Sequence, residues 1–443
     1  MMTSFNISTV GCQMNVSDSE KLSTSLIKMG FQVENSYIDA SVIVVNTCVV
    51  RQSAEDTATG FLGRLRKIKK KSPEKIIVVM GCMVGPNSSN LKKRFPHVDL
   101  WARPQEFYPI LDLLSVRFNK NMEGCLSDLT PISPKISAFV PIVHGCNKFC
   151  TFCIIPFRRG KETSRDSFEI YDEVSLMVER GLKEVTLLGQ NVDSYGHDLE
   201  DRLDLADLVE KIHEIKGLER IRFLTSHPND MSRRIISLVA NLPKVCENIN
   251  LPIQAGDNKV LVDMRRGYTV SQYLRKIEYI KNMIPEISLT TDLIVGFPNE
   301  TDEQFNNSIK LLKEVEFDKV HVAAYSNRDG TYASRKLPDN IDRNIKKERL
   351  NIVDDLQKDI QNTLNRRMLT QKYQILVEGR KRGVMHGRTR TDKIVYLNGN
   401  SNNTLDDLLI GRMIDVKITD YSSWSLSGEV IKNKLNKFEG IAV

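Results

Sequence analysis

The chain of 443 residues contains 41% hydrophobic and 27% charged residues and carries a formal net charge of +7 at pH 7. These proportions are typical of a soluble globular protein, and the length predicts two or three domains. The longest apolar runs have only the length of a strand, which argues against a membrane-spanning helix, and the first residues show no secretory signal. We therefore expect a cytoplasmic protein without a membrane partner, whose eight cysteines bind metal or react instead of forming disulfides.

The positive charge is concentrated near the end of the chain. From Arg367 to Val443 there are 13 Lys and Arg residues against 8 Asp and Glu residues. A basic C-terminal module fits a polyanionic partner such as nucleic acid. Charge alone leaves a solvated surface open as the alternative.

Predicted strands and helices alternate in the first segment, residues 3–118. A capping-box pattern at Ser17–Glu20 predicts the start of a helix that Gly30 ends, and a second helix is expected over Ser53–Lys70. The apolar strand-like runs are Phe5–Val10, Val42–Asn46 and Ile76–Met80. This alternation predicts a Rossmann-like parallel α/β domain.

Residues 119–131 contain turn-forming residues and are predicted to be a linker, and residues 132–364 again alternate strands with helices. The predicted strands are Phe139–Val143, Val185–Leu188, Ile221–Leu224, Asn248–Pro252, Leu289–Val295 and Lys319–Tyr325. The predicted helices are Phe168–Gly181, Leu205–Lys216, Ser232–Ala240, Ser271–Ile284 and Glu303–Val315. Six successive βα units predict a partial (βα)6 barrel.

A long helix is predicted from about Asp342 to Arg367, because apolar residues recur there at helical spacing. The last region, residues 367–434, contains short strand-like segments separated by glycines. These segments are Tyr373–Glu378, Lys393–Leu397, Met413–Thr419 and Ser425–Ile431. Such strands with basic residues predict a small antiparallel β-barrel of the oligonucleotide-binding kind. The fold class is therefore α/β, with two α/β domains followed by a β-barrel.

Three cysteines lie close together at Cys146, Cys150 and Cys153, with the spacing C-x3-C-x2-C on a loop after a predicted strand. Three thiolates at this spacing fit one face of an iron–sulfur cluster and leave a fourth iron open. Zinc is the alternative, but zinc usually takes four nitrogen or sulfur ligands. Only His144 stands near as a fourth candidate, so we favour a cluster.

Three more cysteines, Cys12, Cys48 and Cys82, are 36 and 34 residues apart, and each follows a predicted strand by one or two residues. Right-handed crossovers place the ends of parallel strands on one edge of a sheet, where open α/β sheets bind ligands. Adjacent strands lie about 5 Å apart, so these thiols meet if the strands are neighbours. Three buried small side chains are the alternative. Cys125 and Cys246 match no ligand position, and we expect them to be structural.

The Cys146–Cys153 motif resembles the radical S-adenosylmethionine (radical SAM) superfamily, and the similarity extends over roughly Ser133 to Leu364. The resemblance implies a 4Fe-4S cluster that binds S-adenosylmethionine and releases a 5′-deoxyadenosyl radical. Ligand groups in a βα barrel come from the carboxyl ends of strands, although each such residue can also be a turn residue. The residues implied for cofactor binding are Phe152, Gly189, Gln190, Gln254, Asp292 and Gly296.

The sequences around the dispersed cysteines, Gly11–Asn15, Asn46–Cys48 and Met80–Cys82, resemble the N-terminal domain of the methylthiotransferases, which are radical enzymes with an auxiliary cluster. The motifs that resemble their RNA-modifying branch are Gly145–Cys153, Leu188–Val192, Arg222–Pro228 and Leu251–Gly256. The tail is similar to the TRAM domain, an RNA-binding β-barrel. The resemblance covers nearly the whole chain.

This family resemblance implies two 4Fe-4S clusters, held by the two cysteine sets, which face one cavity. It implies insertion of a methylthio group at carbon 2 of isopentenyl-adenosine next to the tRNA anticodon, with two molecules of S-adenosylmethionine consumed. An electron donor such as flavodoxin or ferredoxin is a further implied partner. The same chemistry on threonylcarbamoyl-adenosine, or on an aspartate of a ribosomal protein, is an alternative. A non-catalytic RNA-binding protein with structural metal sites is an alternative from another class.

Two stretches depart from the usual family sequence, namely Val49–Gln52 and Met83–Pro86. These departures leave local substrate contacts open but do not affect the cysteines. Basic residues near the compact cysteine set are candidate RNA contacts, with solvated surface charge as the alternative. They are Lys148, Arg158, Arg159, Arg265 and Arg266.

Overall fold

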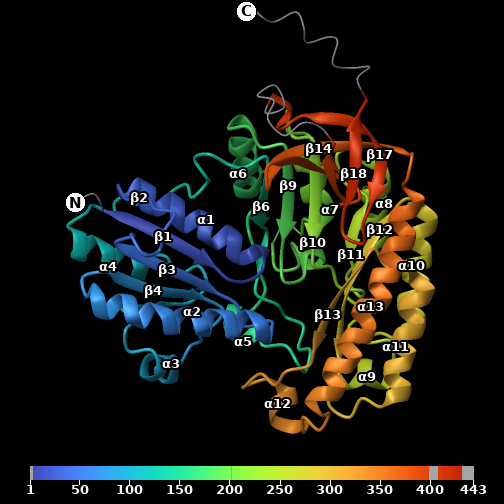
Figure 1. Ribbon diagram of the computed structural model, residues 1–443, viewed down its shortest axis with the longest axis horizontal. Helices are drawn as coiled ribbons and strands as arrows, with labels where there is room; N and C mark the ends of the chain where they lie inside the picture. The colour runs from blue at the N-terminus through green and yellow to red at the C-terminus, as the bar shows by residue number, and fades with distance from the viewer. Residues whose placement is uncertain (1–2, 201, 399–407, 432–443) are drawn as a thin grey trace, which may run out of the picture.

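The structure, a computed structural model, describes residues 3–200, 202–398 and 408–431. Three units follow one another along the chain, namely a parallel sheet with helices, a half-barrel and a small closed barrel (Figure 1). The predicted fold class is confirmed. The exact domain boundaries stay predictions, and residues 432–434 of the predicted C-terminal domain lie outside the described residues. Within the described ranges, no helix is long and apolar enough to cross a membrane.

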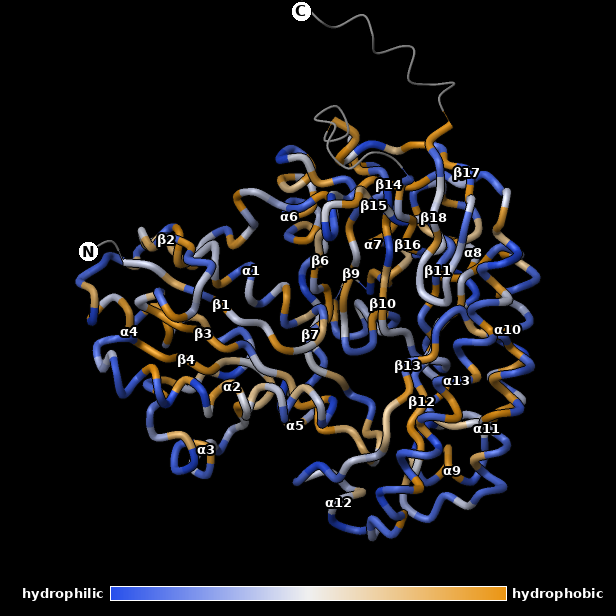
Figure 2. The backbone as a smooth tube through the Cα atoms, viewed as in Figure 1, coloured by the Kyte–Doolittle hydropathy of each residue, from blue (hydrophilic) through white to orange (hydrophobic). Residues whose placement is uncertain are grey.

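The N-terminal unit is a five-stranded, all-parallel sheet with the strand order β2-β1-β3-β4-β5. Its strands are β1 (Ser4–Thr9), β2 (Gln32–Val33), β3 (Val42–Thr47), β4 (Ile76–Gly81) and β5 (Leu100–Ala102). Strands β3 and β4 are buried along their whole length and are apolar almost throughout (Figure 2), as central strands covered on both faces must be. The three strands that precede the dispersed cysteines are therefore direct neighbours.

Four helices accompany this sheet, namely α1 (Gln13–Lys28), α2 (Gln52–Lys71), α3 (Ser89–Arg94) and α4 (Tyr108–Phe118). The expected start of the first helix at Ser17 is wrong, because α1 begins at Gln13 and Cys12 is its N-cap residue. The Asn15 side chain accepts a hydrogen bond from the Cys12 backbone N–H, and the Cys12 carbonyl accepts from the Asn15 N–H. The local pairing of Cys12 with Asn15 thus caps the helix and places a cysteine at its amino end.

The central unit contains two three-stranded parallel sheets, β6-β9-β10 and β11-β12-β13. The strands are β6 (Ser137–Pro141), β9 (Glu184–Leu188), β10 (Arg220–Leu224), β11 (Asn248–Asn250), β12 (Ser288–Val295) and β13 (Lys319–Ala324). A bridge between Ile221 and Val245, and a hydrogen bond from the Ser226 N–H to the Asn250 carbonyl, join the two halves. One apolar core fills the space between the strands and the outer helices. The predicted half-barrel is therefore present.

The long helices of this unit lie outside its strands (Figure 1). They are α6 (Ser167–Glu179), α7 (Leu205–His213), α8 (Arg233–Asn241), α10 (Val270–Met283), α11 (Asp302–Val315) and α13 (Arg343–Arg367). The shorter elements, which sequence analysis did not find, are the hairpin β7 (Val143–His144) and β8 (Thr163–Ser164), α5 (Ile155–Arg159), η1 (Val192–Ser194), α9 (Asn258–Asp263) and α12 (Tyr332–Lys336).

The C-terminal unit is a closed barrel with the strand order β14-β15-β16-β18-β17. Its strands are β14 (Lys372–Lys381), β15 (Val384–Thr389), β16 (Ile394–Leu397), β17 (Met413–Tyr421) and β18 (Leu426–Val430). Sequence analysis missed β15, because its buried positions are Met385, Gly387 and Thr389, which do not form an apolar alternation. Gly387 lies where a Cβ atom would come within 2.3 Å of the Leu376 carbonyl oxygen.

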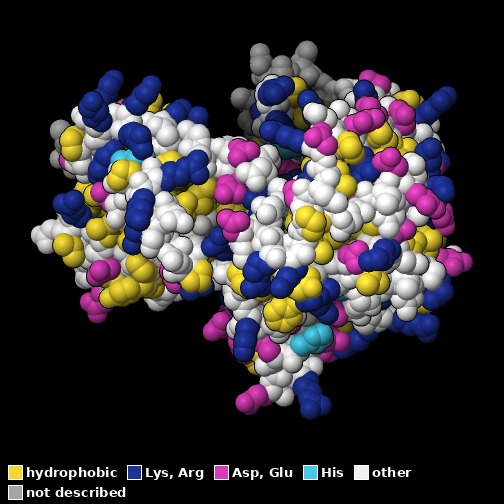
Figure 3. Space-filling model, turned by 90° about the horizontal axis from the view of Figure 1, so that it is seen from below, with side chains coloured by type: hydrophobic (Ala, Val, Ile, Leu, Met, Phe, Trp, Pro, Cys, Tyr) yellow, Lys and Arg dark blue, Asp and Glu magenta, His cyan; other side chains and the backbone are white. Residues whose placement is uncertain are grey.

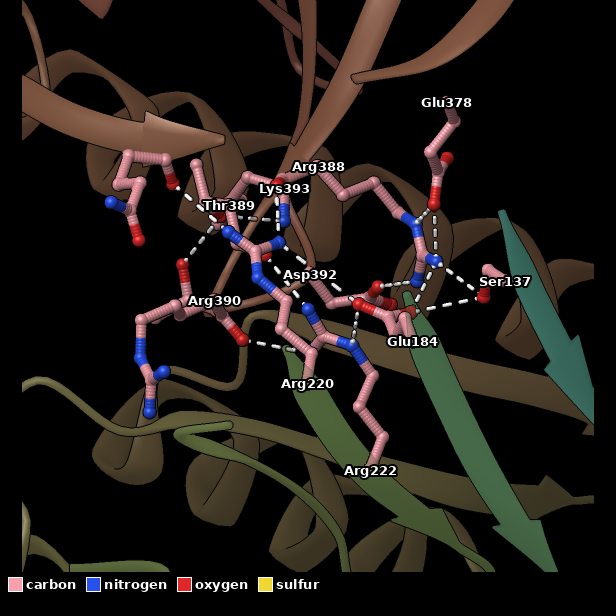
Figure 4. Close-up of polar contacts among 12 residues, drawn as sticks. Ser137, Glu184, Arg220, Arg222, Glu378, Arg388, Thr389, Arg390, Asp392 and Lys393 are labelled. Atoms are coloured by element: carbon pink, nitrogen blue, oxygen red, sulfur yellow. Dashed lines mark hydrogen bonds and ion pairs between the residues drawn. The ribbon is translucent and has the colours of Figure 1, made fainter. Parts of the chain in front are cut away.

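Buried charges attach this small barrel to the amino ends of the half-barrel strands (Figure 4). Glu184, the first residue of β9, has no exposed surface and binds Arg388 of β15 at 2.5 Å and Arg222 of β10 at 3.1 Å. Arg388 also donates to the Ser137 hydroxyl at the start of β6. Arg220 and Arg222 donate to carbonyl groups of β15 and the turn after it. The interface is therefore polar and is organised around one buried carboxylate.

The N-terminal unit contacts the opposite end of the half-barrel, where β1, β3 and β4 point toward it (Figure 1). Helix α1 packs along β6, and Lys21 pairs with Glu173 of α6 at 3.3 Å. On the other side, Arg328 pairs with Glu55 of α2 at 2.5 Å. The two appended units therefore lie at opposite ends of the central strands.

The Glu184 network predicts how the C-terminal barrel responds to mutation and to acid. Burial disfavours the charged carboxylate, but Arg222, Arg388 and Arg220 outweigh burial and hold the pKa of Glu184 below its ordinary value. We expect Glu184→Gln to lower the free energy of opening of β14 and β15 by about 3 kcal/mol or more at pH 7, since it breaks a buried ion pair. Hydrogen exchange of the amides in these strands measures this opening.

A matched control is Glu378→Gln, which removes a partner of the same Arg388 that is 18% exposed, whereas Glu184 is fully buried, and it should have a smaller effect. Because the pKa of Glu184 is lowered on folding, its contribution is complete above the ordinary glutamate pKa of about 4.3 and is lost as the pH falls through the lower folded value. Equal protection of the β14 and β15 amides against hydrogen exchange in wild type and in Glu184→Gln would contradict this account.

Candidate functional site

Cys12, Cys48 and Cys82 lie side by side at the carboxyl edge of the N-terminal sheet, one after each of the adjacent strands β1, β3 and β4. Hydrogen bonding between the Cys12 and Cys48 side chains lowers the pKa of Cys12 to about 6 and raises the pKa of Cys48. The negative charge of a Cys82 thiolate also raises the pKa of Cys48. The structure thus brings the three thiols together as the strand positions predict, and their role as ligands stays a proposal.

A buried pair of asparagines fixes the loops that carry these thiols. Asn15 donates from Nδ2 to Asn46 Oδ1 at 2.8 Å and to the Thr47 carbonyl at 3.1 Å. Asn46 returns a hydrogen bond from Nδ2 to the Asn15 carbonyl at 2.8 Å. Neither side chain has exposed surface, so each needs these partners. Sequence analysis quoted both residues within motifs but assigned them no role. The available signal was their place in the sequence, three residues after Cys12 and two residues before Cys48.

Two glycines allow the same loops to approach one another closely. A Cβ atom at Gly11 would lie 2.7 Å from Cys48 Cβ. A Cβ atom at Gly81 would lie 2.4 Å from the Thr47 carbonyl oxygen, and Gly81 has a φ of +99°. Only glycine suits these two positions, so the residue before Cys12 and the residue before Cys82 are dictated by the packing of the three loops.

The compact set, Cys146, Cys150 and Cys153, lies on the loop between β7 and α5. Thr151, inside this loop, is held by Met264, whose carbonyl accepts from the Thr151 N–H, and by Ala333, which donates its N–H to the Thr151 carbonyl. Segments that follow β11 and β13 thus anchor the loop at the carboxyl end of the half-barrel. Burial raises the pKa of Cys146 and raises that of Cys153 to about 12.

Two arginines donate hydrogen bonds to cysteine sulfurs. Arg159 Nε lies 3.3 Å from Cys82 Sγ, and Arg266 Nη1 lies 3.2 Å from Cys150 Sγ. Both arginine side chains are nearly excluded from solvent. The expectation that Arg159 and Arg266 contact RNA is therefore wrong, because tertiary packing turns both guanidinium groups toward the protein interior.

The other candidate RNA contacts near this loop keep exposed surface. Lys148 is one-third exposed and pairs with Asp230 at 2.8 Å. Arg265 lies over the ring of Tyr332, 4.1 Å from its centroid. Arg158 is partly buried beside Gly85. Their contacts with RNA stay predictions.

The six residues implied for cofactor binding gather near the carboxyl end of the half-barrel. Gly189 and Gln190 follow β9, and Gln254 bridges Leu293 beyond β11. Phe152 of the cysteine loop packs partly buried against the barrel core. These positions agree with a ligand site at the strand ends, but binding itself stays a proposal.

Asp292 and Gly296 are more closely enclosed by neighbouring residues than the other four. Asp292 lies inside β12, three residues before its end, where Asn250 donates to its carboxylate at 3.4 Å and burial raises its pKa. A Cβ atom at Gly296 would lie 2.4 Å from Lys346 Cγ of α13. Packing against α13 therefore accounts for this glycine, whether or not a cofactor lies nearby.

A buried polar cluster connects the ends of β9 and β10, and sequence analysis did not identify it. Asp193 accepts hydrogen bonds from the Ser226 hydroxyl at 2.8 Å and from the His227 N–H at 3.0 Å, and burial raises its pKa to about 7. Asn191 donates to Asp230 at 2.5 Å. Asn191, Ser226 and His227, which belong to the motifs Leu188–Val192 and Arg222–Pro228, thus help to fix the strand ends.

Among the described residues, no three His, Cys, Asp or Glu side chains converge on the position of a single metal ion. A four-iron cluster makes a different demand, because each thiolate binds its own iron. Each cysteine set supplies three soft thiolates and one buried arginine N–H directed at a sulfur, and such hydrogen bonds are a known feature of cluster sites. The two sets therefore fit two clusters. Cys125 and Cys246 are buried apart from both sets.

Three protein-family models match the chain, namely the radical SAM superfamily over residues 140–312, the uncharacterized protein family UPF0004 over residues 4–103 and the TRAM domain over residues 366–431. A relative from Dehalococcoides mccartyi strain CBDB1 is 44% identical over 97% of this chain and 99% of its own length. A relative from Herpetosiphon aurantiacus is 43% identical over 96% of this chain and 97% of its own length. Both are named tRNA-2-methylthio-N(6)-dimethylallyladenosine synthase.

Solved structures support the fold alone. The radical S-adenosylmethionine methyltransferase TsrM from Kitasatospora setae matches with a TM-score of 0.55 at 12% identity, over 75% of this chain and 77% of its own. The cobalamin-dependent S-adenosylmethionine radical enzyme OxsB matches with a TM-score of 0.50 at 12% identity, over 81% of this chain and 56% of its own. Both likenesses concern the backbone arrangement.

The asparagine pair predicts a selective loss of metal. We expect Asn15→Ala to release the Cys12 and Cys48 loops and to lower the iron content of the reconstituted chain by about half, since one of two four-iron sites is affected. Gln13→Ala, an exposed change in the same helical turn, should keep the full iron content. Iron and sulfide analysis after anaerobic reconstitution measures the cluster content of both variants. A full iron content in Asn15→Ala would contradict the role assigned to Asn15.

Proposed function

The chain belongs to the tRNA-2-methylthio-N(6)-dimethylallyladenosine synthases, and we propose on that basis that it inserts a methylthio group at carbon 2 of isopentenyl-adenosine (dimethylallyladenosine) next to the tRNA anticodon. It is a radical SAM enzyme whose cofactors are two 4Fe-4S clusters and S-adenosylmethionine. The single observation that carries the proposal is the pair of cysteine sets, one on each of two carboxyl sheet edges that meet.

Cys12, Cys48 and Cys82 would hold one cluster, and Cys146, Cys150 and Cys153 would hold the other. When bound, these groups and S-adenosylmethionine supply a carbon radical, which can remove a hydrogen that acid–base groups cannot, and the sulfur for transfer. The protein itself positions the cysteine ligands. Each set stands on loops that are pinned by backbone hydrogen bonds or by buried asparagines, so the thiolates need little reorganisation to bind iron.

Contacts between the two units place the sets near one another. Arg159, six residues beyond Cys153, reaches Cys82 of the other unit. Arg51, three residues beyond Cys48, acts electrostatically on Asp292 of β12 and His321 of β13. These contacts support the proposal that the first set faces the strand ends that carry the proposed cofactor residues.

Charge and shape support the proposed cofactor contacts. The carboxylate of Asp292 suits the cationic amino group of S-adenosylmethionine, and the amide groups of Gln190 and Gln254 suit its polar edges. The ring of Phe152 and the backbone at Gly296 suit the flat adenine. The family resemblance implies Phe152 and Gly296 beside the adenine and the backbone of Gly189 beside the methionine amino group. The roles of Asp292, Gln190 and Gln254 are proposed from their charge and polarity alone.

The proposed partner is the anticodon loop of tRNA, whose target base must leave its stack to be reached, which a loop allows more easily than a duplex. Lys and Arg side chains lie on both lobes in the view from below (Figure 3). Near the compact loop, Lys148 and Arg265 keep exposed surface, and so do the rings of Phe149 and Phe157. Cations bind phosphates and aromatic rings stack on bases.

In the C-terminal barrel, Arg388, Arg390 and Lys393 face the half-barrel and form ion pairs there, so they are not the phosphate contacts. Exposed cations among the described residues of this barrel are available for RNA, namely Lys372, Lys381, Arg382, Arg412 and Lys417. A one-electron donor such as flavodoxin or ferredoxin, and a cytoplasmic location, complete the proposal, because the cofactor chemistry requires electrons and tRNA is a cytoplasmic substrate.

Cysteine substitutions test the two sites separately. We expect about eight irons per reconstituted wild-type chain and about four in Cys150→Ala, which should form no 5′-deoxyadenosine, because the compact set binds the cofactor cluster. Cys48→Ala should still cleave S-adenosylmethionine but insert no sulfur. Mass spectrometry of nucleosides from tRNA treated with each variant gives the product, and iron analysis gives the cluster count.

Cys125→Ala and Cys246→Ala are the controls and should retain iron and product. Insertion of sulfur by Cys48→Ala would show that the first set is not the sulfur site. Loss of only the threonylcarbamoyl derivative from the tRNA of a deletion strain would contradict the proposed nucleoside. A chain that binds zinc and no sulfide would contradict the enzymatic proposal as a whole.

A further inference from the structure

The two cysteine sets obtain their arginine donors in different ways. Arg266, which donates to Cys150, belongs to the same unit as that cysteine, and a second hydrogen bond to the Pro252 carbonyl at 3.0 Å holds it there. Arg159, which donates to Cys82, belongs to α5 of the half-barrel, while Cys82 belongs to the N-terminal sheet. The arginine that donates to the first cysteine set therefore belongs to the half-barrel and not to the N-terminal unit.

Arg159 also binds a buried carboxylate of the N-terminal unit. Its Nη2 lies 3.3 Å from Asp18 Oδ2, and the two side chains are only 3% and 1% exposed. Burial raises the pKa of Asp18, and the charge of Arg159 opposes this rise. The guanidinium group is a planar fork with several N–H donors, so one side chain can hold the Cys82 sulfur and the Asp18 carboxylate together.

Neighbouring residues fix this arrangement from both sides. Ile154, directly after Cys153, is buried in the apolar core of the N-terminal unit together with Cys82. The space above Gly85 is filled by Arg158, since a Cβ atom at Gly85 would lie 1.7 Å from Arg158 Nη1. Gly85 lies in the stretch Met83–Pro86 that departs from the usual family sequence, so the guanidinium group of Arg158 packs against this stretch.

A second polar contact connects Asp18 to the segment just before the compact cysteine loop. Gln105, which interacts with Asp18, also lies 2.7 Å from His144 Nδ1. His144 is two residues before Cys146 in the chain. Asp18 is thus connected to both cysteine sets, through Arg159 on one side and through Gln105 and His144 on the other.

We propose that Arg159 is a positioning residue that seats the first cluster against the half-barrel, by holding Cys82 and Asp18 with one guanidinium group. This inference rests on the proposed function in one respect, namely that Cys82 ligates a cluster. Hydrogen bonds to ligand sulfurs are among the features that set cluster potentials. A cationic donor favours the more negative, reduced state, so Arg159 raises the reduction potential of the first cluster.

The test compares two variants that differ at Arg159 and share a neutral residue 18. Asp18→Asn keeps the donor to Cys82, and the double change Asp18→Asn with Arg159→Met removes the donor without leaving an unpaired buried carboxylate. Both are made in a full chain whose compact cysteines are replaced by alanine, so that only the first cluster is observed. Redox titration followed by electron paramagnetic resonance gives the midpoint potential.

We expect the double variant to have a lower potential than Asp18→Asn, by roughly the equivalent of a tenfold change in the ratio of reduced to oxidised cluster, which is about 59 mV for one electron. Arg158→Gln, which removes the adjacent charge but no sulfur contact, should lower the potential by clearly less than the loss of Arg159 does. Equal potentials for Asp18→Asn and the double variant would overturn the proposal.

A second measurement needs no metal. In the iron-free full chain, the double variant should exchange amide hydrogens faster than wild type in α1 and around Cys82, and not in β14 and β15, because Arg159 joins only the N-terminal unit to the half-barrel. Unchanged exchange in α1 would overturn the proposed role. Both readouts are independent of tRNA, so a wild-type chain that fails to modify tRNA would refute the proposed function without touching this inference.

Discussion

The arrangement depends on one geometric constraint, which is that parallel strands present their carboxyl ends on a common edge. In the N-terminal sheet this constraint brings together three thiols that lie 36 and 34 residues apart in the chain. In the half-barrel it gathers the residues after β9, β11 and β12 around the compact cysteine loop. The two edges meet, with Arg159 in contact with Cys82.

Sequence analysis succeeded where burial dictates composition. Strands β3 and β4 are buried throughout, so their apolar runs located both the strands and the cysteines that follow them. It failed for α1, whose true start depends on a hydrogen bond between Asn15 and Cys12 that competes with the capping-box pattern at Ser17. It also missed β15, which pairs along its length but presents glycine and threonine to the interior.

The charged residues show why exposure could not be predicted. Arg159 and Arg266 stand beside loops rich in polar residues, and only contacts with partners 77 and 116 positions away make them interior donors. Arg388 and Arg390 likewise belong to a basic tail but bind carboxylates of the half-barrel. Net charge identified a module that suits RNA, whereas the direction of each side chain required knowledge of which units pack together.

The two ends of the half-barrel therefore bind different units of the protein. At the amino ends of its strands, buried ion pairs around Glu184 hold the C-terminal barrel in a fixed position. At the carboxyl ends, the N-terminal unit closes over the cysteine loop through Ile154 and Arg159. An RNA that contacts both the exposed cations of the C-terminal barrel and the cysteine edge must extend along the flank of the half-barrel. The small barrel and the cysteine edge therefore stand at two separate positions along any such RNA.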